Sequence, residues 1–232
     1  MEEQLTVSNI NIDVVRKNIK NIHLGVYPPD GVVRIAVPLK TNEDAIRLFI
    51  VSKLSWIKRS QKKFEEQERL SDREFKQRES HYFLGKRYLL NVIEDKKPRV
   101  FVKNKTHLNL YVKPNSTQKQ KALIINKWYR DELKKRIPSL IKKWEDLMNV
   151  KVTDWRIKQM KTKWGTCNIE QKRVWINLEL AKKPEHCLEY IIVHEMTHLS
   201  IRHHNEQFLY LMDKYLPNWR QLKTELNKLP IG

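Results

Sequence analysis

Five consecutive residues, His194-Glu195-Met196-Thr197-His198, spell the pattern H-E-x-x-H within an apolar stretch that covers residues 188–199. On a helix, residues four apart lie on the same face, with Cβ atoms about 5–6 Å apart. Two imidazoles at that spacing can bind one Zn²⁺ ion at about 2.0–2.1 Å. Glu195 follows the first histidine and can reach a water on the metal, where a carboxylate serves as general base.

A third histidine follows this stretch closely, because a polar break at residues 202–205 contains both His203 and His204. The five-letter pattern also arises by chance, so this second feature matters for the interpretation. A catalytic zinc site has three protein ligands and keeps its fourth position open for water. The two histidines are neighbours and point in different directions on a regular backbone, so spacing alone leaves the third ligand open.

These residues predict peptide-bond hydrolysis without a covalent intermediate, with one Zn²⁺ ion per chain. The metal lowers the pKa of its water towards about 7. Glu195 accepts that proton and passes it to the leaving amine, which is general acid–base catalysis. The oxyanion-stabilising residue stays open among Arg202, Tyr210 and Tyr215, because none of them has a decisive spacing.

The chain has 232 residues, of which 40% are hydrophobic and 31% are charged. This length allows one large domain or two small ones. No stretch approaches the roughly 20 apolar residues of a membrane span, and the acidic, polar start does not resemble a secretory signal. We therefore expect a cytoplasmic protein with no membrane partner.

The two cysteines, Cys167 and Cys187, are too few for a disulfide framework in a chain of this length. Cys167 lies in a polar turn, where a metal ligand and a reactive thiol are both conceivable roles. A small apolar filler is the commoner role for such a residue.

The 46 Lys and Arg residues outnumber the 27 Asp and Glu residues, which gives a net charge of +19. Such an excess favours association with polyanions such as DNA and RNA, through counterion release. The basic stretches at residues 96–99 and 156–163, with Trp155 and Trp164 interleaved, are candidates for backbone contact and base stacking. Lysine-rich, solvated faces explain the same charge without any partner.

Strands are predicted to dominate the first part of the chain. Residues 6–40 read mostly as strands, with a hairpin turn at Asp30-Gly31. A helix starts at residues 41–44 and is expected to continue as a charged, exposed arm to Glu79. Three further strands are expected at residues 82–90, 100–102 and 108–112.

The polar segment 114–117 is the best internal boundary, and it divides the chain into a β-rich region with the helical arm, residues 1–116, and a catalytic core, residues 117–232. Within the core, a helix over residues 118–148 is expected to break or kink near Ile137, because Pro138 lies inside it. The other expected elements are a strand at 150–157, a loop at 162–168, a strand at 174–180, the motif helix from Pro184, and helices at 206–215 and from Pro217. The fold class is therefore α+β.

Three segments are similar to those of a known family. Lys163-Trp164-Gly165-Thr166-Cys167 resembles a Trp-Gly-Ser-Cys loop, Ile176-Asn177-Leu178-Glu179-Leu180 resembles an Ile-Asn-x-x-Leu strand, and residues 190–199 resemble an active-site helix. His204 precedes a small polar residue and a phenylalanine, here Asn205 and Phe208. This combination resembles the YgjP-like metallopeptidases, small zincins related to the SprT and WLM groups, over nearly the whole chain.

The resemblance implies a zinc ion held by His194, His198 and His204 in a minimal zincin-like core, preceded by an N-terminal β-sheet region and a helical arm. It also implies that the Trp164 loop and the Asn177 strand flank the cleft and contact a protein or peptide substrate. The chain departs from the family's pattern at four positions, which concern the cleft lining more than the metal. His203 stands where the family usually has Asn, Leu209 where it has Trp, and Leu178-Glu179 where it has Trp-Arg.

Two other classes of function stay open. A nucleic-acid-associated protein, for example a protease that acts on DNA-bound proteins, would show a strongly salt-dependent affinity for DNA. A non-catalytic zinc-binding scaffold would carry one zinc ion per chain and cleave no protein. The sequence names neither the substrate nor the oligomeric state.

Overall fold

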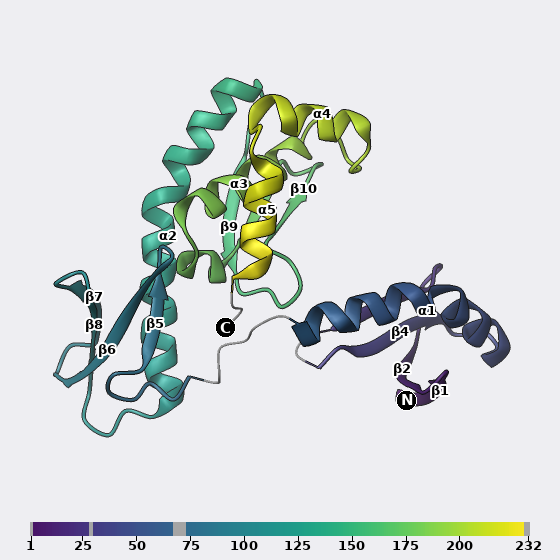
Figure 1. Ribbon diagram of the computed structural model, residues 1–232, viewed down its shortest axis with the longest axis horizontal. Coiled ribbons are helices and arrows are strands. Elements are labelled where there is room, and N and C mark those ends of the chain that lie inside the picture. Colours follow the sequence, from purple (N-terminus) through teal and green to yellow (C-terminus); the bar gives the residue numbers. More distant parts are fainter. Residues whose placement is uncertain (1, 28–29, 67–72, 230–232) are drawn as a thin grey trace. The chain divides into compact units, whose positions relative to one another are not determined.

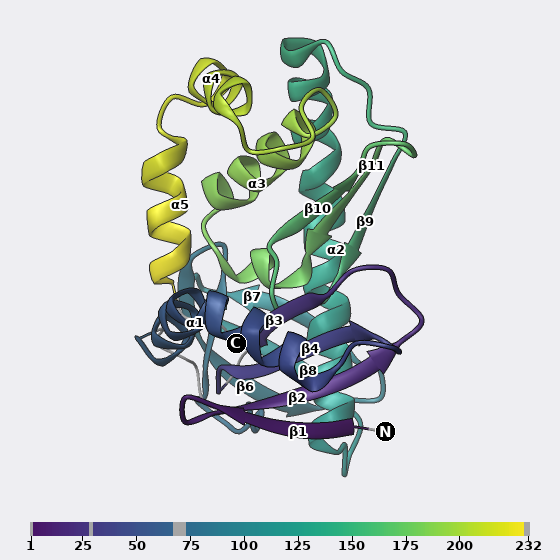
Figure 2. The same ribbon diagram turned by 90° about the vertical axis from the view of Figure 1, so that its right-hand side faces the viewer.

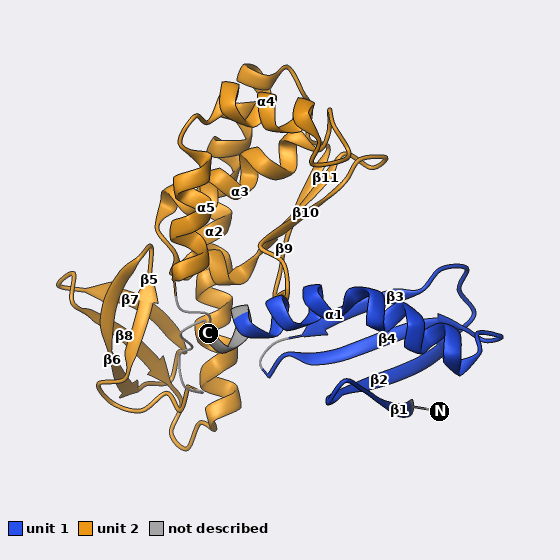
Figure 3. Cartoon of the chain, turned by 45° about the vertical axis from the view of Figure 1, so that its right-hand side comes forward, with its two compact units in different colours: residues 1–68 blue, residues 69–232 orange. Residues whose placement is uncertain are grey.

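The computed structural model describes residues 2–27, 30–66 and 73–229, and it has an α+β fold (Figure 1). The chain divides into two compact units, residues 1–68 and 69–232, and each unit is described by itself (Figure 3). Within the described residues, no helix is both long enough and apolar enough to cross a membrane.

The first unit is a four-stranded sheet that carries one helix. Its strands, in the order β1-β2-β4-β3, are Glu2–Val7, Ile10–Lys17, Val32–Pro38 and His23–Tyr27, and its helix α1 is Glu43–Glu66. Alternate residues of β4 are buried, which places one face of the sheet against apolar residues of α1 such as Ile50. Strands β3 and β4 pair antiparallel, so the predicted hairpin is confirmed, although residues 28–29 at its turn lie outside the described part.

The expected extension of this helix as an exposed arm to Glu79 is wrong in its last part. Residues 67–72 lie outside the described part of the chain, but residues 73–79 are described and are not helical. Phe75 and Arg78 have φ angles of 55° and 64°, which a right-handed helix does not allow. Phe75 is buried in the core of the second unit, and this burial outweighs the helical preference of its charged neighbours.

The second unit begins with a sheet that packs on a long helix. Its strands, in the order β5-β6-β8-β7, are Ser80–Phe83, Lys86–Glu94, His107–Val112 and Arg99–Lys103, and the helix α2 is Gln118–Met148. Thr117 and Gln120 form a capping box at the start of α2. Of the two expected effects of Pro138, a break does not occur: α2 continues past it, with buried residues on both sides such as Leu133 and Ile141.

The rest of the second unit surrounds the motif helix. A second sheet has the order β10-β11-β9, with strands Gly165–Asn168, Arg173–Asn177 and Asp154–Lys158. A short 3₁₀ helix η1, Leu178–Lys182, leads to the motif helix α3, Glu185–Thr197, and the chain ends with α4, Glu206–Tyr215, and α5, Trp219–Lys228. Helix α3 lies between α5 and the sheet (Figure 2).

Two predictions for this region need correction. The predicted loop at 162–168 contains strand β10, because residues 165–168 pair antiparallel with β11. The predicted strand at 174–180 ends at Asn177, whose side chain caps η1 by accepting a hydrogen bond from Glu179 N. The apolar residues after Asn177 are buried in a 3₁₀ turn, and apolar runs of this length do not distinguish the two structures.

The boundary between the units also differs from the expected one at residues 116–117. The β5–β8 sheet, α2 and α3 share one hydrophobic core, which includes Leu90, Leu133 and Ile192. The polar segment before Gln118 is therefore a connection inside the second unit rather than a boundary between domains.

The turn between β5 and β6 contacts the start of the motif helix. Leu84 N donates to Ala181 O at 2.9 Å, and Gly85 N donates to Lys182 O at 3.1 Å. Gly85 has a φ of +77°, and a Cβ at this position would lie 2.6 Å from Cγ of Pro184, the N-cap residue of α3. The turn therefore requires glycine both for its backbone conformation and for its packing.

We predict that Gly85→Ala lowers the free energy of unfolding by about 2–4 kcal/mol, because left-handed strain adds to overpacking against Pro184. Gly31→Ala in the first unit is the control: its φ is +68°, but the nearest atom to its Cβ would be Cγ of the flexible Gln61 side chain at 3.0 Å, and the backbone Cα of Gln61 lies at an ordinary contact distance of 3.4 Å. It should cost about 1 kcal/mol. Thermal unfolding compares the two variants, and equal losses would show that the contact with Pro184 contributes nothing.

Candidate metal centre

Helix α3 is buried on most of its surface, as expected for a helix that lies between other elements. Apolar residues such as Ile192, Val193 and Met196 are completely buried. The helix ends at Thr197, and His198 is its C-cap with helical dihedral angles, φ −64° and ψ −19°. His194 and His198 therefore keep the one-turn spacing of the motif, and both are only partly buried.

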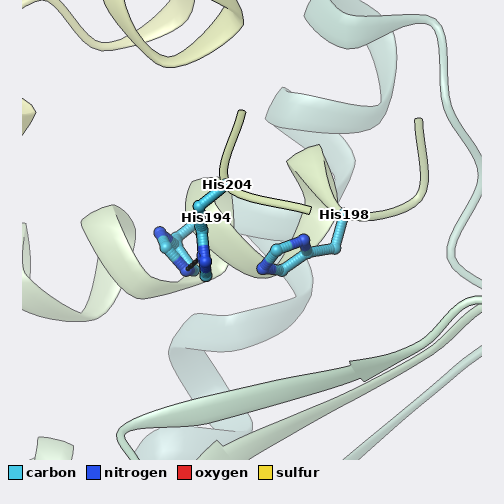
Figure 4. Close-up of side chains that lie close together, drawn as sticks. All are labelled: His194, His198 and His204. Carbon is cyan, nitrogen blue, oxygen red and sulfur yellow. Dashed lines mark hydrogen bonds between the residues drawn. The ribbon is translucent and has the colours of Figure 1, made fainter. Parts of the chain in front are cut away.

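The rings of His194, His198 and His204 converge (Figure 4). Their centroids are 5.1 Å apart for His194 and His198, 4.9 Å for His194 and His204, and 4.7 Å for His198 and His204. One ring nitrogen from each histidine lies within 4.8 Å of the other two. The Nε2 atoms of His194 and His204 are 3.0 Å apart, close to the roughly 3.3–3.4 Å that tetrahedral zinc–nitrogen bonds require. The donor set therefore fits one metal ion.

Neighbouring groups fix the orientation of these rings. His198 Nδ1 donates to the carbonyl oxygen of Ile201 at 3.1 Å, which leaves Nε2 free of a proton and able to bind a cation. Buried Phe208 contacts all three imidazoles, with centroid distances of 5.1 Å to His194, 4.8 Å to His198 and 4.6 Å to His204. The Asn205 side chain caps α4 by accepting from Phe208 N, so the helix start places both His204 and Phe208.

His203 lies outside the cluster, although it is adjacent to His204 in the sequence. Its side chain is exposed, and the group of possible metal ligands contains His204 instead. His194 Nδ1 is buried and has no hydrogen-bond partner among the described residues. Packing against Tyr190 and Phe208, with ring centroids 6.0 Å and 5.1 Å from that of His194, orients this ring in place of a hydrogen bond.

The surroundings of the three imidazoles favour their neutral forms. Burial, together with the smaller effects of the neighbouring His198, His204 and Lys223, lowers the pKa of His194 to about 3. Burial also lowers the pKa values of His198 and His204. Neutral imidazole is the form that binds a metal ion.

Glu195 lies beside this cluster on the same helix. Its side chain is buried, and burial raises the pKa of its carboxyl group to about 8, against a lowering effect from Lys163. Within the described residues, it makes no hydrogen bond or ion pair. A Cβ at Gly165 would lie 2.7 Å from both Cγ and Oε1 of Glu195, so only glycine leaves space for this carboxylate.

A cavity of about 1010 Å³ opens over these residues. Trp164 and Tyr190 line it, and burial raises the pKa of Tyr190 to about 12. Of the three residues considered for stabilising an oxyanion, Arg202 lines the cavity, whereas Tyr210 and Tyr215 do not. The cavity is at the upper end of the range for ligand sites, which leaves room for a chain segment.

The structure does not bring Asn177 to the cavity, so the expected substrate contact of this residue is not supported. Its side chain is buried and fully engaged, since Nδ2 donates to Met160 O at 2.9 Å and to Lys163 O at 2.7 Å. Its Oδ1 accepts from Met160 N and Glu179 N. Asn177 therefore holds the segment before β10 in place and acts on the cavity only through that segment.

The cysteines contribute no metal ligand to this cluster. Cys167 lines the cavity, but burial raises the pKa of its thiol to about 11, which disfavours the thiolate that would bind a metal. Cys187 lies near His186 and Glu225. In that group, burial raises the pKa of Cys187 to about 12, and His186 Nε2 already pairs with Glu225 at 2.9 Å, which links α3 to α5.

The sequence gives only a weak signal for three residues that shape the site. Gly165 and Phe208 belong to segments that resemble the family, but their contacts with Glu195 and the imidazoles come from other elements. Tyr190 lies four residues before His194, and this spacing places both residues on one face of a helix.

No curated protein matches the chain. Two solved structures are similar to part of it: the metallopeptidase zymogen of Pyrococcus abyssi abylysin has 17% identity and a TM-score of 0.36, and it covers 41% of this chain and 99% of its own. The metallopeptidase zymogen of Methanocaldococcus jannaschii jannalysin has 22% identity and a TM-score of 0.35, and it covers 39% and 92%.

The family comparison extends over most of the sequence. The model of the YgjP-like, metallopeptidase domain matches residues 20–229, which include α3 and every residue of the three-imidazole cluster. A metallopeptidase requires a metal cofactor, and these imidazoles supply a suitable donor set. The chain therefore belongs to the YgjP-like metallopeptidase family.

Proposed function

We propose that this protein is a zinc-dependent peptidase in which His194, His198 and His204 hold one zinc ion and Glu195 is the general base. One observation carries the proposal: three neutral imidazoles converge beside a buried carboxylate that has no partner among the described residues. Buried carboxylates without partners are rare, and groups with strongly shifted pKa values are concentrated at functional sites.

The ligand set favours zinc over harder cations. All three donors are imidazole nitrogens, whereas magnesium and calcium prefer oxygen ligands. A zinc ion with three protein ligands polarises a carbonyl and makes its bound water more acidic.

Glu195 moves the proton in this scheme. Its carboxylate accepts a proton as water attacks the scissile carbonyl carbon, and it then delivers that proton to the nitrogen of the leaving amine. Burial of the side chain raises its basicity, which is what a base that acts near neutral pH requires. Because Gly165 has no side chain, the carboxylate has space between α3 and β10.

Strand β10 is the element that we expect to bind the substrate backbone. It forms an edge of its sheet, and residues 163–170 line the cavity. An extended peptide can add to such an edge through main-chain hydrogen bonds, and its side chains then alternate between the cavity and solvent. Trp164 stands at the start of this strand, where it can contact a substrate side chain.

We predict that Glu195→Gln retains zinc and lowers kcat by about 10²–10⁴-fold, because the amide cannot accept the proton. Metal content and turnover of a protein mixture are measured on the same preparation. Retained turnover would refute the assignment of the base. Loss of zinc together with activity would instead show that Glu195 supports the metal site.

The two adjacent histidines provide a second test. His204→Ala should lose zinc and activity, since it removes one of three ligands, whereas His203→Ala should keep both. Zinc is measured by mass spectrometry of metals after dialysis. If only the His203 variant loses zinc, the ligand set proposed here is incorrect.

Gly165→Ala tests the position of the carboxylate. The new methyl group must displace Glu195 Oε1, which lies 2.7 Å from its ideal place. We expect kcat to fall by about 10–100-fold with unchanged zinc content, because a displacement of about 1 Å is costly in catalysis. Gly25→Ala in the first unit is the control for a glycine substitution in a strand. An unchanged kcat in Gly165→Ala would argue against Glu195 as the general base.

A further inference from the structure

Three exposed cations line the cavity, and they come from three different segments. Lys163 precedes β10, Arg202 lies between α3 and α4, and Lys223 lies on α5. We call these three residues the cationic rim. They share the cavity with the metal-binding cluster and with Glu195.

The backbone of each rim residue is anchored by the same contacts that build the site. The carbonyl oxygen of Lys163 accepts the 2.7 Å hydrogen bond from Asn177 Nδ2. Arg202 follows Ile201, whose carbonyl oxygen accepts from His198 Nδ1. Lys223 lies one turn after the buried Trp219, and its Nζ is 5.7 Å from the centre of that ring. The contacts within the second unit therefore fix the backbone positions of the three rim residues.

The charge of the rim is not neutralised by the protein. None of its three residues forms an ion pair within the described part of the chain. Cations nearby in the sequence are paired, for example Arg173 with Asp154 at 2.7 Å and Lys182 with Glu179 at 2.7 Å. The rim therefore offers its charge to a molecule that enters the cavity.

Only two acidic residues are found among the described residues that line the cavity, Glu195 and Glu170. Glu195 is the proposed base. Glu170 lies in the turn between β10 and β11, at the opposite end of β10 from Lys163. The lining next to the imidazoles is therefore positive, and a bound divalent cation would add to that charge.

We propose that the cationic rim selects peptides with aspartate or glutamate side chains close to the scissile bond, an inference that rests on the proposed peptidase function. Lys163, Arg202 and Lys223 line the same cavity as β10, so a peptide bound along β10 brings its carboxylates close to cations that form no ion pair within the described residues. Exposed ion pairs are weak one by one and are screened by salt. We expect aspartate instead of asparagine at a flanking position to raise kcat/KM by about 3–10-fold at low ionic strength.

The experiment uses the zinc-loaded full-length chain and a library of peptides from a digested proteome. The cleavage sites define the preference at each flanking position, with Glu195→Gln as the blank. Matched fluorogenic peptides that differ only in Asp or Asn at the most selective position then give kcat/KM for the wild type, Lys163→Glu and Lys223→Glu. Lys161→Glu and Lys228→Glu are the controls, because these exposed lysines lie on the same segments but do not line the cavity.

The proposal predicts that acidic residues are enriched at the cleavage sites. It also predicts that the ratio of kcat/KM for the Asp peptide to that for the Asn peptide falls or inverts in the two rim variants and stays unchanged in the controls. Cleavage without acidic enrichment would overturn it and leave the peptidase intact. If a single-stranded oligonucleotide competes with peptide cleavage by the wild type but not by Lys163→Glu, the rim binds nucleic acid and the proposal is overturned. Absence of any cleavage by the wild type would overturn the peptidase function itself.

Discussion

The hydrogen bond between His198 Nδ1 and the carbonyl oxygen of Ile201, at 3.1 Å, is the contact on which the proposed metal centre depends. It fixes the tautomer that leaves Nε2 available to a cation. It also closes the turn after α3, where Ile201 N donates to Thr197 O at 3.0 Å. That turn reverses the chain, so His204 returns to within 3.0 Å of His194. One short segment thus orients His198 and places His204, two of the three proposed ligands.

The packing behind the ligands gives this turn its rigidity. Thr197 is completely buried, and its hydroxyl donates to Val193 O at 2.8 Å and lies 3.4 Å from Met212 Sδ. Phe208, one turn earlier than Met212 on α4, supports all three imidazoles. The face of α4 that holds the rings is therefore also the face that fills the core below α3. A change in this packing would alter the metal site without touching a ligand, because interiors are closely packed and transmit displacement.

The sequence predicted the parts of this protein that depend on local spacing, and it missed those that depend on distant contacts. The one-turn separation of His194 and His198 follows from helix geometry alone, and the third imidazole was expected from the break that follows. In contrast, the non-helical, buried conformation of Phe75 depends on a core made by strands and helices far along the chain. The role of Asn177 follows from Met160 and Lys163, which approach it only after the sheet has formed. The family resemblance pointed to Asn177, but it did not show which atoms this side chain would bind.

Glu195 shows how the fold balances stability against chemistry. A buried carboxylate without a partner destabilises the folded state, and an ion pair with a nearby lysine would relieve that cost. Lys163 is close enough to lower the pKa of this carboxyl group, but it forms no ion pair with it. Such a pair would bring the pKa of Glu195 down and weaken it as a base. By anchoring the Lys163 backbone through Asn177 and leaving its side chain exposed, the fold keeps Glu195 basic and keeps the lysine charge available to an entering molecule.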